Sequence, residues 1–124
     1  MDDCLAAKKI LDSGATCVLC YKGMVIKNDK EGLTPLFEFI DSKFDFTMFS
    51  SAIKRVDMIV AFLYLKLSIK NIICYEITKS ALELLENNEV KVHYKDFIEI
   101  DSRLEEELKD INDIDSAYQI IRSI

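Results

Sequence analysis

The sequence contains little that interrupts regular structure: one proline and three glycines in 124 residues. Half of its residues are hydrophobic. A chain of this composition packs a core instead of remaining disordered, and a chain of this length buries roughly 65–70% of its unfolded surface. We therefore expect one folded domain over residues 1–100, followed by an extension over residues 101–124.

The chain also lacks a long hydrophobic run. The apolar run at residues 58–65 ends at Lys66, and it is far shorter than the about 20 residues that a bilayer span needs. The N-terminal Met-Asp-Asp has no basic start of the kind that opens a secretory signal. We expect a soluble, cytoplasmic protein that does not contact a membrane.

An excess of basic residues is missing as well, since the net charge is −6. Residues 1–95 carry thirteen acidic and thirteen basic side chains, whereas residues 96–124 carry nine acidic and three basic ones. The body is neutral and the C-terminal extension is acidic. Without a basic stripe to follow a phosphate backbone, nucleic-acid binding is not expected.

The apolar residues that are present concentrate in residues 56–77. If residues 56–67 are helical, they are apolar around nearly the whole circumference, which is typical of a helix covered by other elements. Residues 69–77 are rich in β-branched and aromatic side chains and predict a buried strand. A helix followed directly by a strand indicates a sheet with helices packed on its faces.

Local patterns predict the remaining elements. Thr34 suits a helix cap and Pro35 the first helical position, and Ser80 to Glu83 form a capping box. The expected helices are at 2–13, from 34, at 80–88 and once or twice within 101–124, and the expected strands are at 16–21, 24–27, 46–49 and 90–95. This order predicts an α/β fold with one five-stranded mixed sheet and helices on both faces.

Three segments resemble a known family: CVLCYKGMVI at 17–26, PLFEFI at 35–40, and YEIT at 75–78 leading to ALELL at 81–85. The family is an uncharacterised domain of unknown function in small bacterial and archaeal proteins, and the resemblance covers about residues 5–97. It implies a three-layer, cytidine-deaminase-like fold, whose element order is the order predicted above.

The chain departs from this family in two places. Asp57-Met58-Ile59-Val60 aligns with the family's Gly-Lys-Ala-Ala at the start of the central helix. The family's later Asn-Arg and Cys-Pro segment has no counterpart, and Ser102-Arg103 is its nearest remnant. Sites that the family builds from those parts are therefore not carried over to this chain.

A zinc deaminase needs a His or Cys ligand, a Glu two residues later and a Pro-Cys-x-x-Cys pair. The only histidine, His93, is followed by Tyr94 and Lys95, and no Pro-Cys-x-x-Cys occurs. Because His93 alternates with apolar residues, we expect it on the wet face of a strand. No zinc, no cofactor and no catalytic residue are expected, and an enzyme is the less favoured interpretation.

Cys17 and Cys20 do match Cys-x-x-Cys, but they lie in a predicted strand. Residues three apart on a strand face opposite sides and lie about 10 Å apart, so these thiols cannot share a metal or form a disulfide. We expect reduced, buried thiols at Cys4, Cys17, Cys20 and Cys74. A redox or metal protein that uses the cysteines is the weakest of the functional hypotheses.

Ligands of open α/β sheets bind beyond the carboxyl ends of parallel strands, near helix N-termini. Basic residues at the start of the helix at 56–67 oppose its dipole, and an anion there would relieve the conflict. That anion is either a ligand or Glu76, paired internally with Lys54 or Arg55. The candidate ligand-binding residues are Ser50, Ser51, Lys54, Arg55, Glu76 and Thr78.

Two functional hypotheses remain. The first is a non-catalytic interaction module on a deaminase-like scaffold without the zinc site, which binds a protein partner or a second copy of itself. The alternative is a protein that binds a small, nucleotide-like anion, or a non-zinc enzyme, with its site beyond the strands predicted at 46–49 and 69–77.

The acidic extension carries an apolar stripe at helical spacing, formed by Leu104, Leu108, Ile111, Ile114, Tyr118 and Ile121. Such a stripe must be buried somewhere. It packs either on its own sheet or on a second copy, and closed two-fold pairing is the commonest soluble assembly. We expect residues 101–124 to be helical and to contribute to a homodimer.

Overall fold

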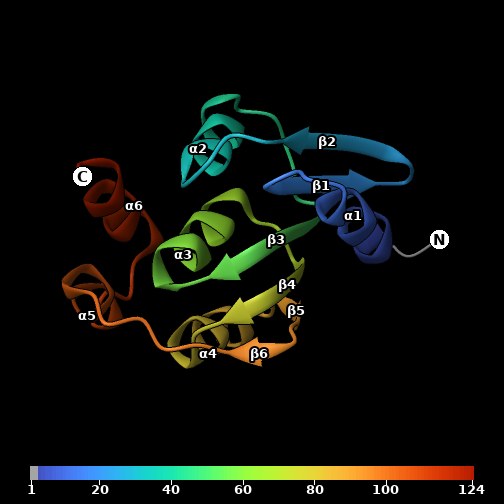
Figure 1. The fold of residues 1–124 in the computed structure, drawn as a ribbon. Coiled ribbons are helices and arrows are strands. Elements are labelled where there is room, and N and C mark those ends of the chain that lie inside the picture. The colour runs from blue at the N-terminus through green and yellow to red at the C-terminus, as the bar shows by residue number, and fades with distance from the viewer. Residues whose placement is uncertain (1–2) are drawn as a thin grey trace.

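The computed structural model describes residues 3–124 as a mixed sheet with helices on both faces (Figure 1). Asp2, the expected first residue of the first helix, and the side chain of Cys4 lie outside the described residues. The helices are α1 Asp3–Asp12, α2 Thr34–Asp41, α3 Met58–Leu67, α4 Lys79–Asn87, α5 Arg103–Lys109 and α6 Ile114–Arg122. The strands are β1 Cys17–Tyr21, β2 Met24–Asn28, β3 Ser50–Val56, β4 Asn71–Ile77, β5 Lys91–His93 and β6 Asp96–Phe97.

The strands run in the order β2-β1-β3-β4-β5 across the sheet, and β6 also pairs with β4. β1 is antiparallel to both β2 and β3, whereas β3, β4, β5 and β6 are parallel. The mixed sheet predicted from the sequence is thus confirmed, but it has six strands instead of five. Of the strand expected at 90–95, only 91–93 are a strand, β5, and β6 at 96–97 is an additional strand that was not predicted. β5 and β6 pair with successive parts of β4.

Helices cover the two faces of the sheet unequally. Within residues 3–124, α1 is the one helix on the first face, where Ala7 and Leu11 share a core cluster with Val18, Cys20 and Ala52. The other face carries α3 at its centre, with α2, α4, α5 and α6 around it. α3 is enclosed by the sheet and by four helices. This agrees with the sequence, which gives α3 no wide polar face.

The strand expected at 46–49 is wrong: these residues form a turn that precedes β3. Thr47 bonds to the Asp45 carboxylate through its backbone N–H, and the Phe49 N–H donates to the Phe46 carbonyl at 2.9 Å. The rings of Phe39, Phe44, Phe46, Phe49 and Tyr21 pack against one another at centroid distances of 5.0–6.2 Å. Phe46 and Phe49 are therefore buried by a ring cluster, not by a sheet.

Two expected helix caps are also displaced. α2 has Leu33 at its N-cap position and no side-chain cap, although Pro35 lies in the first turn as expected. α4 is capped by Thr78, whose hydroxyl accepts from the Ala81 N–H, and not by the box at Ser80. α3 begins at Met58, two residues later than expected, because Asp57 caps it.

The C-terminal extension forms two short helices that pack on α3 of the same chain. Ser102 caps α5 and Asp113 caps α6. Leu108 and Ile121 are fully buried in the main core, and the other members of the apolar stripe pack against that core. The stripe is therefore covered within the chain.

None of the helices within residues 3–124 is long and apolar enough to cross a membrane.

Candidate functional site

The carboxyl ends of β3, β4 and β6 meet at one edge of the sheet, because these strands are parallel. α3 and α4 begin directly beyond β3 and β4. Asp57 accepts a hydrogen bond from the Val60 N–H at 2.9 Å, and Thr78 accepts one from the Ala81 N–H at 3.2 Å. The chain that leaves β6 passes α4 on its way to α5 (Figure 1).

A pocket of about 780 Å³ opens at this edge, between the start of α4, the segment after β6, and α5. The lining residues are Thr78, Lys79, Ser80, Phe97, Ile98, Glu99, Ile100, Asp101, Glu105 and Lys109. The segment after β6 stays attached to the sheet, since the Ile98 N–H donates to the Ile77 carbonyl at 3.0 Å. Three separate elements thus form the walls.

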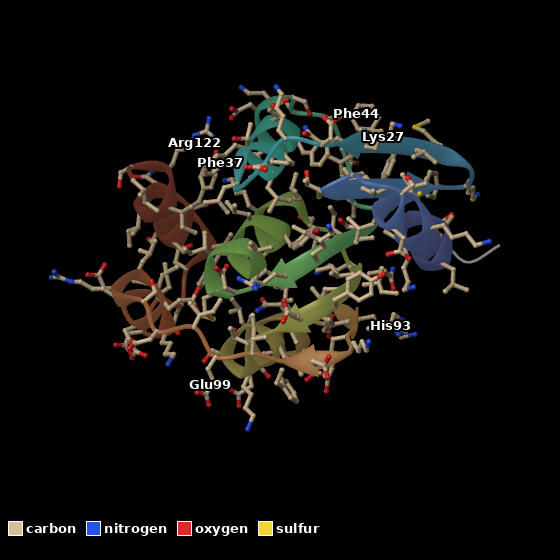
Figure 2. All side chains as sticks on the ribbon, viewed as in Figure 1. Lys27, Phe37, Phe44, His93, Glu99 and Arg122 are labelled. Atoms are coloured by element: carbon tan, nitrogen blue, oxygen red, sulfur yellow. The ribbon has the colours of Figure 1, made fainter. Side chains whose placement is uncertain are left out.

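The pocket lining carries charges of both signs. The Lys79 ammonium lies 5.7 Å from the centre of the Phe97 ring, and Lys109 Nζ lies 2.9 Å from a Glu106 carboxylate oxygen. Glu99 projects away from the body of the protein (Figure 2). The site can therefore attract an anionic group and also accept hydrogen bonds from donor groups of the same ligand.

Glu105 is the most constrained charged group of the pocket. Its side chain comes from α5, yet both of its carboxylate oxygens accept from the Met58 N–H at the start of α3, at 2.9 and 3.2 Å. The residue is only 3% exposed. The first turn of the central helix is therefore neutralised by a carboxylate of the same chain, in addition to its own cap at Asp57.

Burial raises the pKa of Glu105, and the negative charge of Asp57 raises it further. The N–H groups of Met58 and Ile59 and the charge of Lys109 lower this pKa without cancelling the rise. A carboxyl group whose pKa is higher in the folded state binds its proton more tightly there. Its contribution to stability is therefore complete below its usual pKa of 4.5 and decreases as the pH rises through the folded value.

Glu105→Gln is expected to remove this pH dependence, because the amide keeps an acceptor for Met58 and carries no charge. The measurement is the free energy of unfolding by urea between pH 4 and 7. The wild-type value should fall relative to that of Glu105→Gln as the pH rises above about 4.5. Glu105→Ala should cost about 1–3 kcal/mol throughout, because the buried Met58 N–H loses its acceptor.

Glu107→Gln is the matched control, since Glu107 is on the same helix and makes only an exposed ion pair with Arg103. It should follow the wild-type curve. A difference between wild type and Glu105→Gln that stays constant from pH 4 to 7 would contradict the raised pKa.

The residues predicted from the sequence are only partly brought to this edge. Thr78 lines the pocket. Lys54 and Arg55 lie in β3 and not at the start of the central helix, which corrects the expected position. Arg55 pairs with Glu76 of the neighbouring strand at 3.3 Å, the internal pairing that was the alternative to a ligand.

Ser50 and Ser51 lie at the opposite end of β3. Ser50 is in register with Asn71, five positions before Glu76, so on the order of 16 Å separates Ser50 from the pocket edge. The buried Ser51 hydroxyl donates to the Val18 carbonyl at 3.0 Å and lies 2.7 Å from the Tyr64 hydroxyl. These contacts hold β1, β3 and α3 together, and they leave no free hydroxyl at Ser51.

Lys79, Phe97, Glu105 and Lys109 line the pocket but were not predicted as site residues. Lys79 directly follows Thr78, so its position just after the buried strand at 69–77 could have predicted it as a site residue. Nothing in the sequence indicates that Glu105 meets Met58, because 47 residues separate the two.

The cysteines of β1 face opposite sides of the sheet, as strand geometry predicted. Cys17 belongs to the core around α3, whereas Cys20 belongs to the core under α1. Burial raises the pKa of Cys17 to about 11 and that of Cys74 to about 12. Both thiols therefore stay protonated at neutral pH.

In the part of the chain that the structure describes, no three His, Cys, Asp or Glu side chains are grouped so that they could hold a metal ion. His93 lies on β5 and points away from the protein (Figure 2).

Comparisons with known proteins identify relatives. Residues 6–124 match the protein family described as TM1506, a domain of unknown function (DUF1893). The fold is similar to the crystal structure of a DUF1893 family protein (TM1506) from Thermotoga maritima, with a TM-score of 0.83 and 21% sequence identity. The likeness covers 99% of this chain and 90% of that one. No curated protein matches this chain.

Proposed function

The chain belongs to the DUF1893 family of domains of unknown function, and we propose that it is a non-catalytic binding module with a small ligand in the pocket between α4 and α5. The observation that carries this proposal is the position of the pocket, beyond the carboxyl ends of β4 and β6. Open α/β sheets bind their ligands at this edge. A volume of about 780 Å³ is also within the usual range for small-molecule sites.

The lining supports a ligand that combines an anion with a ring and with hydrogen-bond donors. The ammonium groups of Lys79 and Lys109 suit a phosphate or carboxylate. The half-exposed Phe97 ring offers a stacking surface, and the carboxylate of Asp101 can accept hydrogen bonds from hydroxyl or amino groups. A nucleotide-like anion, such as a nucleoside monophosphate, has all three features.

Binding without catalysis is supported by the state of the nucleophilic side chains. Cysteine acts as a nucleophile in its thiolate form, and the raised pKa values of Cys17 and Cys74 keep both thiols protonated. The Thr78 hydroxyl already serves as the cap of α4. His93 lies on β5, outside the pocket lining.

We further propose that the scaffold is cytidine-deaminase-like and has lost the zinc site. The observed order α1-β1-β2-α2-β3-α3-β4-α4-β5 supports this, because it is the element order of that fold. Buried, reduced thiols at Cys17 and Cys74 fit a cytoplasmic protein. At the start of α3, the carboxylates of Asp57 and Glu105 accept hydrogen bonds from the first-turn N–H groups of Val60 and Met58.

Nucleoside monophosphates are expected to bind to the wild-type protein and to raise its melting temperature. The panel contains the monophosphates, the free nucleosides, inorganic phosphate and Zn²⁺, and calorimetry gives the affinity of each. Lys79→Ala should weaken monophosphate binding by about 10- to 100-fold, because a charge-assisted hydrogen bond contributes about 1.5–3 kcal/mol.

Lys91→Ala is the matched control, because Lys91 is an exposed lysine on β5, outside the pocket lining. It should bind the monophosphates as the wild-type protein does. The proposal is wrong if no monophosphate binds, or if Lys79→Ala and Lys91→Ala bind equally well.

A further inference from the structure

β2 is an edge strand with an uncovered outer side. It is the first strand in the sheet order, and within residues 3–124 it pairs only with β1 (Figure 1). Met24 is 52% and Val25 is 42% exposed. An edge of this kind presents unpaired N–H and C=O groups to which another strand can add.

The hairpin turn determines which backbone groups of β2 are free. Lys22 and Gly23 form a two-residue turn with φ values of 46° and 85°, and Tyr21 and Met24 are the pair that flanks it. Antiparallel pairs alternate between bonded and non-bonded positions. The N–H and C=O groups of Val25 and Lys27 therefore point away from β1.

Apolar side chains also lie beside this edge on the α2 side of the sheet. Tyr21, which pairs with Met24, lies 5.5 Å from the ring of the buried Phe49, and Phe49 lies 6.2 Å from the ring of Phe44, which is 56% exposed. Exposed apolar patches mark interaction sites. The stripe of the C-terminal helices, by contrast, is already covered within the chain.

We propose that β2 pairs antiparallel with β2 of a second copy of this chain, about a two-fold axis at Val25. The two sheets then form one continuous sheet, and each copy uses the same surface. Met24 of one copy lies opposite Ile26 of the other, and Val25 meets Val25. Apolar pairs of this kind stabilise neighbouring strands.

The side-chain pairs within β2 select the Val25 axis from the three registers that bring the free backbone groups of Val25 and Lys27 together. An axis at Lys27 places Lys27 against Lys27. An axis at Ile26 places Val25 opposite Lys27 and Met24 opposite Asn28, at both ends of the contact, so that the apolar side chains lose their apolar partners. The Val25 axis pairs Val25 with Val25 and Met24 with Ile26, and no like charges face each other within β2.

The native mass as a function of concentration tests the pairing. Light scattering should give a wild-type mass that rises from 14.3 kDa toward twice that value. Val25→Lys places two positive charges on the axis and should keep the single-chain mass at the same concentrations, with a cooperative melting transition.

Leu5→Lys is the control, since Leu5 is an apolar residue on α1 that is 55% exposed, more than Val25. This variant should follow the wild-type mass curve. A wild-type protein that keeps the single-chain mass up to its highest soluble concentration overturns the proposal. So does a Val25→Lys protein with the wild-type mass curve.

Single cysteine substitutions at positions 25, 26 and 27 then identify the axis. Opposite residues of a bonded pair lie about 5.5 Å apart between Cα atoms, a distance that a disulfide spans. Under an added oxidant, Val25→Cys should give a covalent dimer on a non-reducing gel. Ile26→Cys, Lys27→Cys and the wild-type chain should remain monomeric on the same gel. Stronger cross-linking by Ile26→Cys or Lys27→Cys overturns the Val25 axis.

Discussion

Replacing Phe62 by aspartate is expected to prevent folding. Phe62 is at the centre of α3, is 2% exposed and is enclosed by the main core. Removal of a buried phenylalanine costs about 3–5 kcal/mol, and an unpaired buried carboxylate costs several kcal/mol more. The sum is comparable to the about 5–15 kcal/mol that stabilises a domain. Circular dichroism of the purified variant should show no cooperative thermal transition.

Phe62→Leu is the control, because it keeps most of the apolar volume without a charge. It should fold and lose less than about 1.5 kcal/mol. If Phe62→Asp is soluble and melts cooperatively near the wild-type temperature, the central position of α3 in the core is wrong.

Removal of the C-terminal helices by ending the chain at Asp101 is expected to have the second large effect. Leu108 and Ile121 are fully buried against α3, and each contributes about 1.5–3 kcal/mol by its burial. The truncation also deprives the Met58 N–H of the Glu105 carboxylate, at a cost of about 1–3 kcal/mol. The shortened chain should be unfolded, or should melt at least about 15 °C below the full chain.

A chain that ends at Arg122 is the control, because it lacks only the last two residues, of which Ile124 is mostly exposed. It should have the same melting temperature as the full chain. The native mass of each chain is recorded in the same experiment, since the sequence also predicts that the extension contributes to a homodimer. Equal melting temperatures for the full chain and the chain ending at Asp101 would contradict a structural role of α5 and α6.

The candidate site could be predicted only in part. Thr78 directly follows a buried strand, which the local sequence predicted, whereas its role as the cap of α4 was predicted for Ser80 instead. Ser50 and Ser51 were expected at the same edge because the preceding strand was assigned four residues too early. When a strand is assigned too early along the chain, the residues after it are expected at the wrong end of the sheet. The predicted site then changes completely, while the fold class does not.

Elements with a periodic pattern and with partners close in the chain could be predicted from the sequence. Residues 58–67 are apolar on nearly all sides and form the enclosed helix α3, and the Lys22-Gly23 turn joins β1 to β2. In both cases the signal and the structure that it specifies lie within a few residues of each other. Local propensity is then sufficient.

Features that depend on contacts between residues far apart in the sequence were seen only in the tertiary structure. Phe46 and Phe49 have the composition of a strand, but rings at Phe39 and Tyr21 bury them in a turn. Glu105 is one of three consecutive glutamates, and only packing of α5 places its carboxylate on the first turn of α3. A contact between residues far apart in the sequence produces no periodic pattern near either residue. Such contacts form only when the fold brings the two residues together, so they could not be predicted from the sequence.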